Sequence, residues 1–87
     1  MNFGKALEAL KTGKKVAREG WNGKEQFLFI VDGTSLEYST SADLSCLLDK
    51  EVPHSDVIAI KTTSGVIQVG WLASQTDMLA EDWVIVD

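Results

Sequence analysis

The amino-acid sequence predicts a small α+β domain, in which a mostly antiparallel sheet is combined with an N-terminal helix and one or two short helices. Apolar residues recur at helical spacing near the start of the chain, and short β-forming runs separated by turn signals follow. The elements run helix, strand, strand, polar segment, strand, strand, helix, strand, an order that favours the α+β class. With 87 residues, the chain is expected to form one domain over 1–87, whose thin core favours self-association.

The first helix is indicated by apolar residues at positions i, i+3, i+4 and i+7, which are Phe3, Ala6, Leu7 and Leu10. Asn2 is suited to cap the start of this helix, and Gly13 is suited to end it. Residues 14–18 then favour a short strand. Asn22-Gly23 is the usual centre of a tight turn, because both residue types tolerate positive φ.

The continuous apolar run from Phe27 to Val31 predicts a central strand that is covered on both faces. Residues 34–56 are polar, and a short helix is the one element expected there. Its signals are a capping-box pattern of Thr40 with Asp43 and leucines at helical spacing at positions 44, 47 and 48.

A hairpin and a closing strand are predicted in the C-terminal third. The apolar runs 57–62 and 66–71 flank a turn at 63–65, and period-two alternation places Ile67, Val69 and Trp71 on one face. The run 83–86 is expected to be the last strand. Between them, Ser74 and Asp77 form a second capping-box pattern, so a short helix is expected to begin near Gln75.

Charge is spread unevenly along the chain. The formal net charge is -5, but residues 1–24 carry a net of +4 and residues 25–87 a net of -9. The acidic total opposes binding to nucleic acid polymers and to anionic membranes, which both need a basic footprint. The basic N-terminal region is suited either to receive a small anion or simply to keep an exposed helix and turn soluble.

Cysteine and histidine are too scarce for a disulfide or a metal cluster, because Cys46 and His54 are the only residues of their types. No apolar stretch approaches the roughly 20 residues of a membrane span, and the chain does not open on a signal-peptide pattern. We therefore expect a reduced cytoplasmic protein without a metal or other cofactor.

A catalytic set is not evident in the sequence. It contains no Gly-x-Ser-x-Gly, no phosphate-binding P-loop, no Gly-x-Gly-x-x-Gly and no His-Glu-x-x-His. Asp77 and Glu81 would share a helix face, and Asp82 follows them, but exposed helix acids are usually a solvated surface. The sequence therefore predicts that the protein is not an enzyme.

Three tryptophans lie at the ends of predicted segments. Trp21 adjoins the Asn-Gly turn, Trp71 ends a strand, and Trp83 opens the last strand and is expected to be mostly core. An indole is a broad stacking surface that suits a purine or a protein partner. Beside Trp71, the helix start at 74–77 offers backbone N–H groups to an anion. The alternative is that the tryptophans fill the core and that Ser74 and Asp77 only cap a helix.

Two segments resemble a known family. The N-terminal segment consists of three strings, which are Met1-Asn2-Phe3-Gly4-Lys5-Ala6-Leu7, Gly13-Lys14-Lys15-Val16-Ala17-Arg18 and Gly20-Trp21-Asn22-Gly23-Lys24. Near the C-terminus they are Gly70-Trp71-Leu72-Ala73-Ser74-Gln75-Thr76-Asp77-Met78-Leu79-Ala80 and Asp82-Trp83. Together they are similar to the second type of Thoeris anti-defence sponge, a family of small phage-encoded proteins. The polar stretch 34–56 departs from the family pattern and is shorter than expected there.

The resemblance implies a phage or prophage protein that acts in the cytoplasm of the bacterial host. Members of the family bind cyclic ADP-ribose isomers made by the Thoeris immune sensor and hold them without cleavage, so that the effector is not activated. The family is homotetrameric with pockets at subunit interfaces, and some members also hold cyclic dinucleotides.

Residue chemistry and position in the matching strings then suggest roles for single residues. Trp21 and Trp71 are candidate stacking walls, and Arg18 or Lys24 would meet the diphosphate.

Polar side chains of the same strings would hold the rest of the ligand. Asn22 and Gln75 would hydrogen-bond base or ribose edges, and Ser74 and Thr76 would hold a second polar edge. Asp77 would accept from a ribose hydroxyl or an adenine amine. Two other functions stay open at this point: a module that inhibits a host protein through an aromatic patch and, ranked last, a small nucleotide hydrolase.

Overall fold

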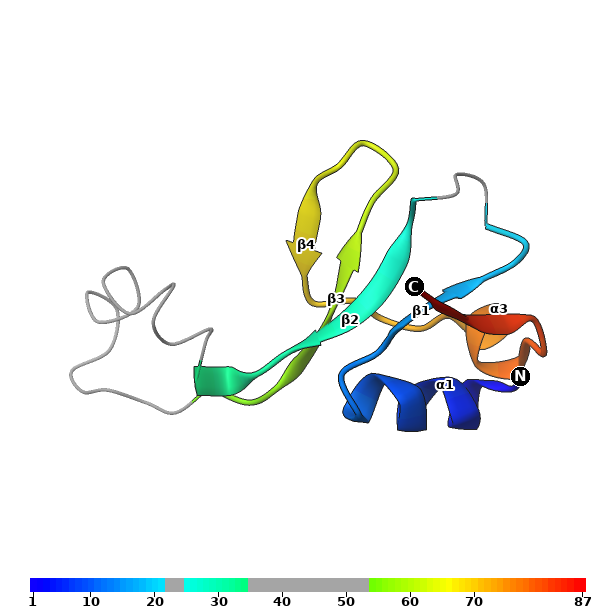
Figure 1. Cartoon of the computed structure of the whole chain (residues 1–87), viewed down its shortest axis with the longest axis horizontal. Coiled ribbons are helices and arrows are strands. Elements are labelled where there is room, and N and C mark those ends of the chain that lie inside the picture. The colour runs from blue at the N-terminus through cyan, green and yellow to red at the C-terminus, as the bar shows by residue number, and fades with distance from the viewer. Residues whose placement is uncertain (22–24, 35–53) are drawn as a thin grey trace.

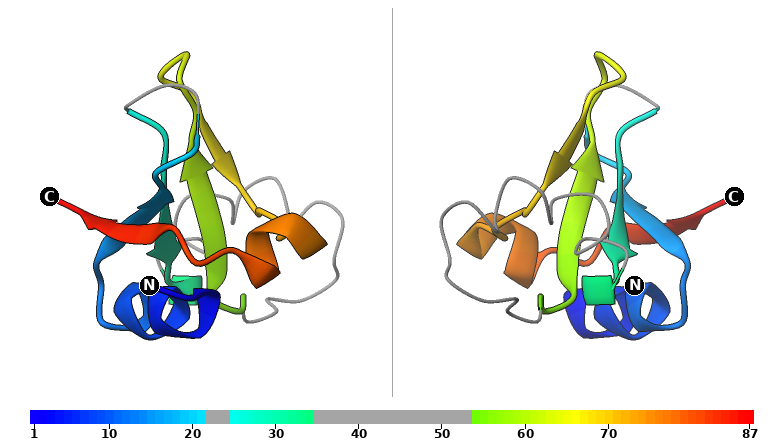
Figure 2. Two further views of the ribbon diagram at one scale, coloured as in Figure 1. Left: turned by 90° about the vertical axis from the view of Figure 1, so that its right-hand side faces the viewer. Right: turned by 90° about the vertical axis from the view of Figure 1, so that its left-hand side faces the viewer.

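Five antiparallel strands form one sheet in the order β4-β3-β2-β1-β5 in the computed structural model, which describes residues 1–21, 25–34 and 54–87 (Figure 1). The elements are α1 (Phe3–Lys11), β1 (Lys15–Arg18), β2 (Phe27–Val31), β3 (Val57–Lys61), β4 (Ile67–Val69), α3 (Gln75–Leu79) and β5 (Trp83–Val86). This arrangement confirms the predicted α+β class. The tip of the β3–β4 hairpin stands away from α1 and α3 (Figure 2).

Helix α1 begins and ends where the sequence predicts. The Asn2 side chain accepts a hydrogen bond from the backbone N–H of Lys5 at 2.9 Å, so it caps the first turn. After the last turn, Gly13 has a φ of 89°, a conformation that costs glycine little because it lacks a Cβ. The helix is therefore fixed at both ends by local chemistry.

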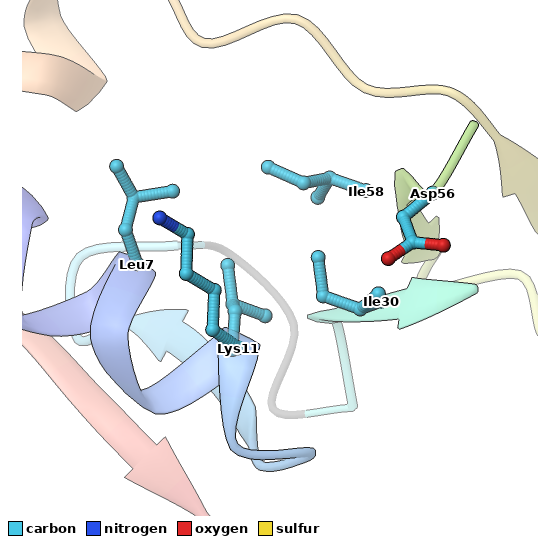
Figure 3. A pocket seen from close by; sticks show the side chains of 6 residues that line it. Leu7, Lys11, Ile30, Asp56 and Ile58 are labelled. Atoms are coloured by element: carbon cyan, nitrogen blue, oxygen red, sulfur yellow. The ribbon is translucent and has the colours of Figure 1, made fainter. Parts of the chain in front are cut away.

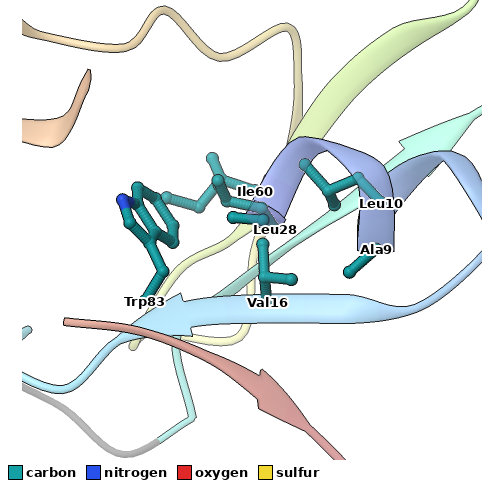
Figure 4. Packing of buried hydrophobic residues seen from close by; sticks show 7 residues of the cluster. Ala9, Leu10, Val16, Leu28, Ile60 and Trp83 are labelled. Atoms are coloured by element: carbon teal, nitrogen blue, oxygen red, sulfur yellow. The ribbon is translucent and has the colours of Figure 1, made fainter. Parts of the chain in front are cut away.

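The core lies between α1 and one face of the sheet. Strand register places Val16, Leu28 and Ile60 side by side across β1, β2 and β3, and Trp83 projects from the same face of β5. The buried residues of α1 in this core are Ala6, Ala9 and Leu10. Ala9 and Leu10 are labelled in Figure 4. Trp83 has no exposed surface, which confirms its predicted place in the core.

The opposite face of the sheet is also mostly apolar, although Lys15 and Lys61 lie over the Phe27 ring. Phe27, Phe29 and Val31 point to it from β2 and are partly exposed. Helix α1 packs on the Trp83 face, and α3 is bonded to that face through the Trp83 indole. For the described part of the chain, the prediction that β2 is covered on both faces is therefore wrong, because the helices that the structure describes lie on one side. We call this second surface the open sheet face.

The β3–β4 hairpin forms around the predicted turn, where Gly65 has a φ of 87°. Ile67 and Val69 lie on the open sheet face, but Trp71 packs against the core on the other side. The prediction of a shared face is thus wrong for Trp71. The reason is Gly70, whose φ of 99° ends β4 and breaks the period-two alternation.

Helix α3 begins at the predicted capping box. The Ser74 hydroxyl accepts from the backbone N–H of Asp77 at 3.1 Å, and the Asp77 carboxylate accepts from the backbone N–H of Ser74 at 3.2 Å. The helix predicted around 40–48 and the Asn22-Gly23 turn lie outside the described residues.

Candidate functional site

The three tryptophans meet in one cluster, although they come from three separate segments. Trp83 is its floor; the ring centroid of Trp21 lies 5.5 Å from that of Trp83, and the centroid of Trp71 lies 6.2 Å from it. Trp21 and Trp71 meet each other edge to face at 6.3 Å and 66°. Because Trp21 and Trp71 are partly exposed while Trp83 is buried, these two rings are the accessible surface of the tryptophan cluster.

Arg18 bridges two carboxylates, one on α3 and one just before β5. Its Nη1 donates to Asp77 Oδ1 at 2.9 Å, and its Nε donates to Asp82 Oδ1 at 2.9 Å. The other oxygen of Asp82 accepts from the backbone N–H of Gly20 at 3.1 Å. We call Arg18, Asp77 and Asp82 the carboxylate clamp; only 19% of the Arg18 side chain and 16% of the Asp77 side chain are exposed.

The clamp shifts the pKa values of its members in the direction that favours their charged forms. Hydrogen bonds to Asp82 and Asp77 raise the pKa of Arg18, and the bond from Arg18 lowers the pKa of Asp82. Burial raises the pKa of Asp77, but hydrogen bonds from Ser74 and Arg18 outweigh it, so that the net pKa of Asp77 is lowered. All three groups are therefore charged at neutral pH.

The remaining predicted site residues on α3 face solvent. Ser74, Gln75 and Thr76 are exposed, and the Ser74 hydroxyl also donates to Asp77 Oδ2 at 2.8 Å. The structure therefore brings five predicted residues into one connected group, which are Arg18, Trp21, Trp71, Ser74 and Asp77. Gln75 and Thr76 follow on the exposed surface beside that group. The predicted site residues Asn22 and Lys24 lie outside the described residues.

Two features of this region were not identified from the sequence. Asp82 is not a solvated acid, because it binds Arg18; the signal in the sequence is its place just before β5, whose first residue pairs with Arg18. Leu72, three residues before α3, and Leu79, the last residue of α3, are 92% and 79% exposed.

A separate groove of about 320 Å³ lies between the second half of α1 and the adjacent ends of β2 and β3 (Figure 3). Its lining residues are Leu7, Leu10, Lys11, Ile30, Asp56 and Ile58. The groove is mostly apolar, with one ammonium and one carboxylate among its lining groups, and it contains none of the predicted site residues. The predicted site and this groove are therefore different places on the molecule.

The described part of the chain offers neither a metal cluster nor a membrane span. In the ranges 1–21, 25–34 and 54–87, no three His, Cys, Asp or Glu side chains are grouped so as to hold a metal ion. Within the same ranges, neither helix is long and apolar enough to cross a bilayer.

Comparison with known proteins identifies the family. The Thoeris anti-defense 2-like domain matches residues 1–86 of this chain. Thoeris anti-defense 2 of Bacillus phage SP01 is 44% identical over 86 residues, which make up 99% of this chain and 94% of the phage protein. The tryptophan cluster and the carboxylate clamp both lie within the matched range. The chain therefore belongs to the Thoeris anti-defense 2-like family, as the strings near its two ends indicate.

Proposed function

We propose that this phage anti-defence protein binds a cyclic ADP-ribose isomer and holds it intact, so that the Thoeris effector is not activated. The observation that carries the proposal is the tryptophan cluster, where Trp21 and Trp71 are partly exposed on a buried floor of Trp83. Stacking of a base on an aromatic ring contributes about 1–3 kcal/mol of affinity. The cluster is therefore suited to the adenine of such a nucleotide.

Polar groups around the cluster suit the remainder of the ligand. Gln75, Thr76 and Ser74 lie on the exposed start of α3, next to Trp71 in the chain. Their amide and hydroxyl groups would bind ribose hydroxyls and the base edge. Asn22 and Lys24 stay predictions for the base edge and the diphosphate, and cyclic dinucleotides are further candidate ligands.

We propose further that the protein works as a homotetramer in the host cytoplasm. The support is the open sheet face, where apolar side chains of β2 and β4 are exposed or partly exposed, together with exposed Leu72 and Leu79. A chain of this size gains stability when a second copy covers such surfaces. Light scattering should give a mass near four times 9.5 kDa, and a mass near 9.5 kDa would remove any pocket built between subunits.

The test of sequestration is calorimetry with cyclic ADP-ribose isomers and cyclic dinucleotides, followed by recovery of the ligand. After heat denaturation of the complex, chromatography should return the ligand unchanged, because no catalytic set is evident in the sequence. Release of ADP-ribose with turnover would instead favour the hydrolase.

Matched variants locate the site in the same experiment. Trp21→Ala or Trp71→Ala should weaken binding by about tenfold to a hundredfold, the loss expected for one stacked base. Lys5→Gln removes an exposed ion pair with Glu8 on α1 and should bind as the wild type does. If both tryptophan variants are folded and bind normally, the ligand does not lie on the tryptophan cluster.

A second candidate function is supported by the leucines. Leu72, which follows Trp71 in the chain, and Leu79, at the end of α3, are exposed, as expected of a module that inhibits a host protein through an aromatic and apolar patch. Under that function, Leu72→Ser with Leu79→Ser would abolish anti-defence activity while nucleotide binding was absent in wild type and variant alike.

A further inference from the structure

Helix α3 holds its place with very little apolar contact. It spans five residues, Gln75–Leu79, and none of them is buried. Helices this short are not stable alone, since one or two turns do not offset the cost of nucleation. We therefore attribute the position of α3 mainly to its hydrogen bonds with Arg18 and Trp83.

Asp77 makes most of the polar contacts that hold α3. Its Oδ1 accepts from Arg18 and its Oδ2 from Ser74, while its backbone carbonyl accepts from Trp83 Nε1 at 3.0 Å. One residue of α3 is thereby bonded to the end of β1, to the helix cap and to the floor of the tryptophan cluster. Its carboxylate oxygens are both used inside the protein.

Arg18 completes the connection on the other side. Its guanidinium spans Asp77 and Asp82, which stand on either side of the turn between α3 and β5. Asp82 is bonded to Gly20, and the backbone N–H of Trp21 donates to the carbonyl of Arg18 at 3.2 Å. The clamp thus reaches the segments that carry both exposed rings: Trp21 on one side and, through the Ser74 cap, Trp71 on the other.

We propose that Arg18 and Asp77 are positioning residues, which fix α3 and the spacing of Trp21 and Trp71 without themselves touching the ligand. The part of this proposal that concerns ligand affinity rests on the proposed function. The proposal assigns Arg18 and Asp77 roles different from contacts with diphosphate or ribose. Two Arg18 donors and both Asp77 carboxylate oxygens are satisfied by protein groups before any ligand arrives. The planar fork of arginine suits a bridge between two carboxylates, which the single ammonium of lysine does not reproduce.

The ligand arm is a double-mutant cycle on affinity. The variants are Arg18→Gln, Asp77→Asn and the double variant, measured by calorimetry against the cyclic ADP-ribose isomer that the wild type binds. If the two residues act as one clamp, the double variant should bind within about twofold of the weaker single variant. If each residue touches the ligand separately, the loss of affinity in the double variant should equal the product of the two single losses to within about twofold. That result would overturn the proposal.

A second arm needs no ligand. The Trp83 indole N–H is bonded to the Asp77 carbonyl, so its hydrogen exchange by NMR reports whether α3 stays against the sheet. Arg18→Gln, Asp77→Asn and Arg18→Lys should each speed this exchange by at least about tenfold, and Lys5→Gln should leave it unchanged. Unchanged exchange in a folded Arg18→Gln protein would refute the clamp, whatever happens to binding.

The two arms separate the failure of this proposal from failure of the proposed function. Wild-type protein that binds no cyclic ADP-ribose isomer would refute sequestration, while the exchange arm would still decide whether the clamp holds α3. Should Arg18→Gln fail to fold, Asp82→Asn is measured in its place against the same two readouts, because an amide offers one acceptor oxygen and no charge where the carboxylate accepts from both Arg18 and Gly20. Loss of affinity without faster indole exchange would make Arg18 a ligand contact and overturn the proposal.

Discussion

Replacing Trp83 with alanine should remove most of the stability of this domain. The indole has no exposed surface and lies 5.4 Å from the Phe3 ring, with Trp21 and Trp71 on its other sides. Emptying a large aromatic site costs about 3–5 kcal/mol, and three neighbouring rings leave little room for collapse, so the upper half of that range applies. The lost bond to the Asp77 carbonyl adds about 1 kcal/mol. A domain of 87 residues has about 4–13 kcal/mol in total.

The assay is urea unfolding followed by far-ultraviolet circular dichroism, since the variants change the fluorescence itself. Protein concentration is held fixed, because an oligomer is stabilised by mass action. Trp83→Phe keeps a ring in the core but loses the indole donor, and it should cost about 1–2 kcal/mol. Trp71→Ala is the matched control at a partly exposed ring and should cost less than Trp83→Ala. A loss below about 1 kcal/mol for Trp83→Ala would refute the assignment of Trp83 as the floor of the cluster.

Two further predictions follow from single contacts. Asp77 and Asp82 have lowered pKa values in the folded protein, so the stability they add is present above about pH 4 and is lost as pH falls through the folded values. As pH is lowered from 7 to 2, the melting temperature should therefore fall less steeply for Asp82→Asn than for the wild type. Equal slopes for the two proteins would contradict this. At Gly33 an added Cβ would overlap the His54 carbonyl oxygen, so Gly33→Ala should cost about 1–3 kcal/mol in urea unfolding. Gly4→Ala, which meets only ordinary contacts, should be neutral or slightly stabilising.

Most of the fold can be predicted from the sequence because its signals are local. Asn2 and Ser74 cap helices through bonds to residues three positions ahead, and each strand is a short run of β-formers. The burial of β2 could not be predicted in the same way. A continuous apolar run indicates apolar surroundings on both faces, but whether the second face is covered by the same chain depends on how much helix that chain supplies.

The candidate site is harder to predict from the sequence than the fold, because it is assembled by contacts between residues far apart in the chain. Position in the matching strings indicated Arg18 and Asp77, and chemistry alone pointed Arg18 toward an anionic ligand. The anions it meets in the structure are two carboxylates of its own chain, brought near by the pairing of β1 with β5. The break at Gly70, which turns Trp71 to the core, depends on a backbone angle that period-two alternation does not include.

The pairing of β1 with β5 makes the tryptophan cluster and the carboxylate clamp depend on a strand that is synthesised long after β1. Arg18 is separated from Asp77 by 59 positions and from Asp82 by 64, and the floor of the tryptophan cluster is the first residue of β5. Contacts of this separation form late in folding, since a long loop must close before they contribute. A nascent chain that lacks β5 has no buried tryptophan and no complete sheet, and its Asp82 has no following strand to hold it beside Arg18. Binding competence should therefore appear in a single step when β5 leaves the ribosome, and a chain truncated before Trp83 should be unfolded rather than weakly active.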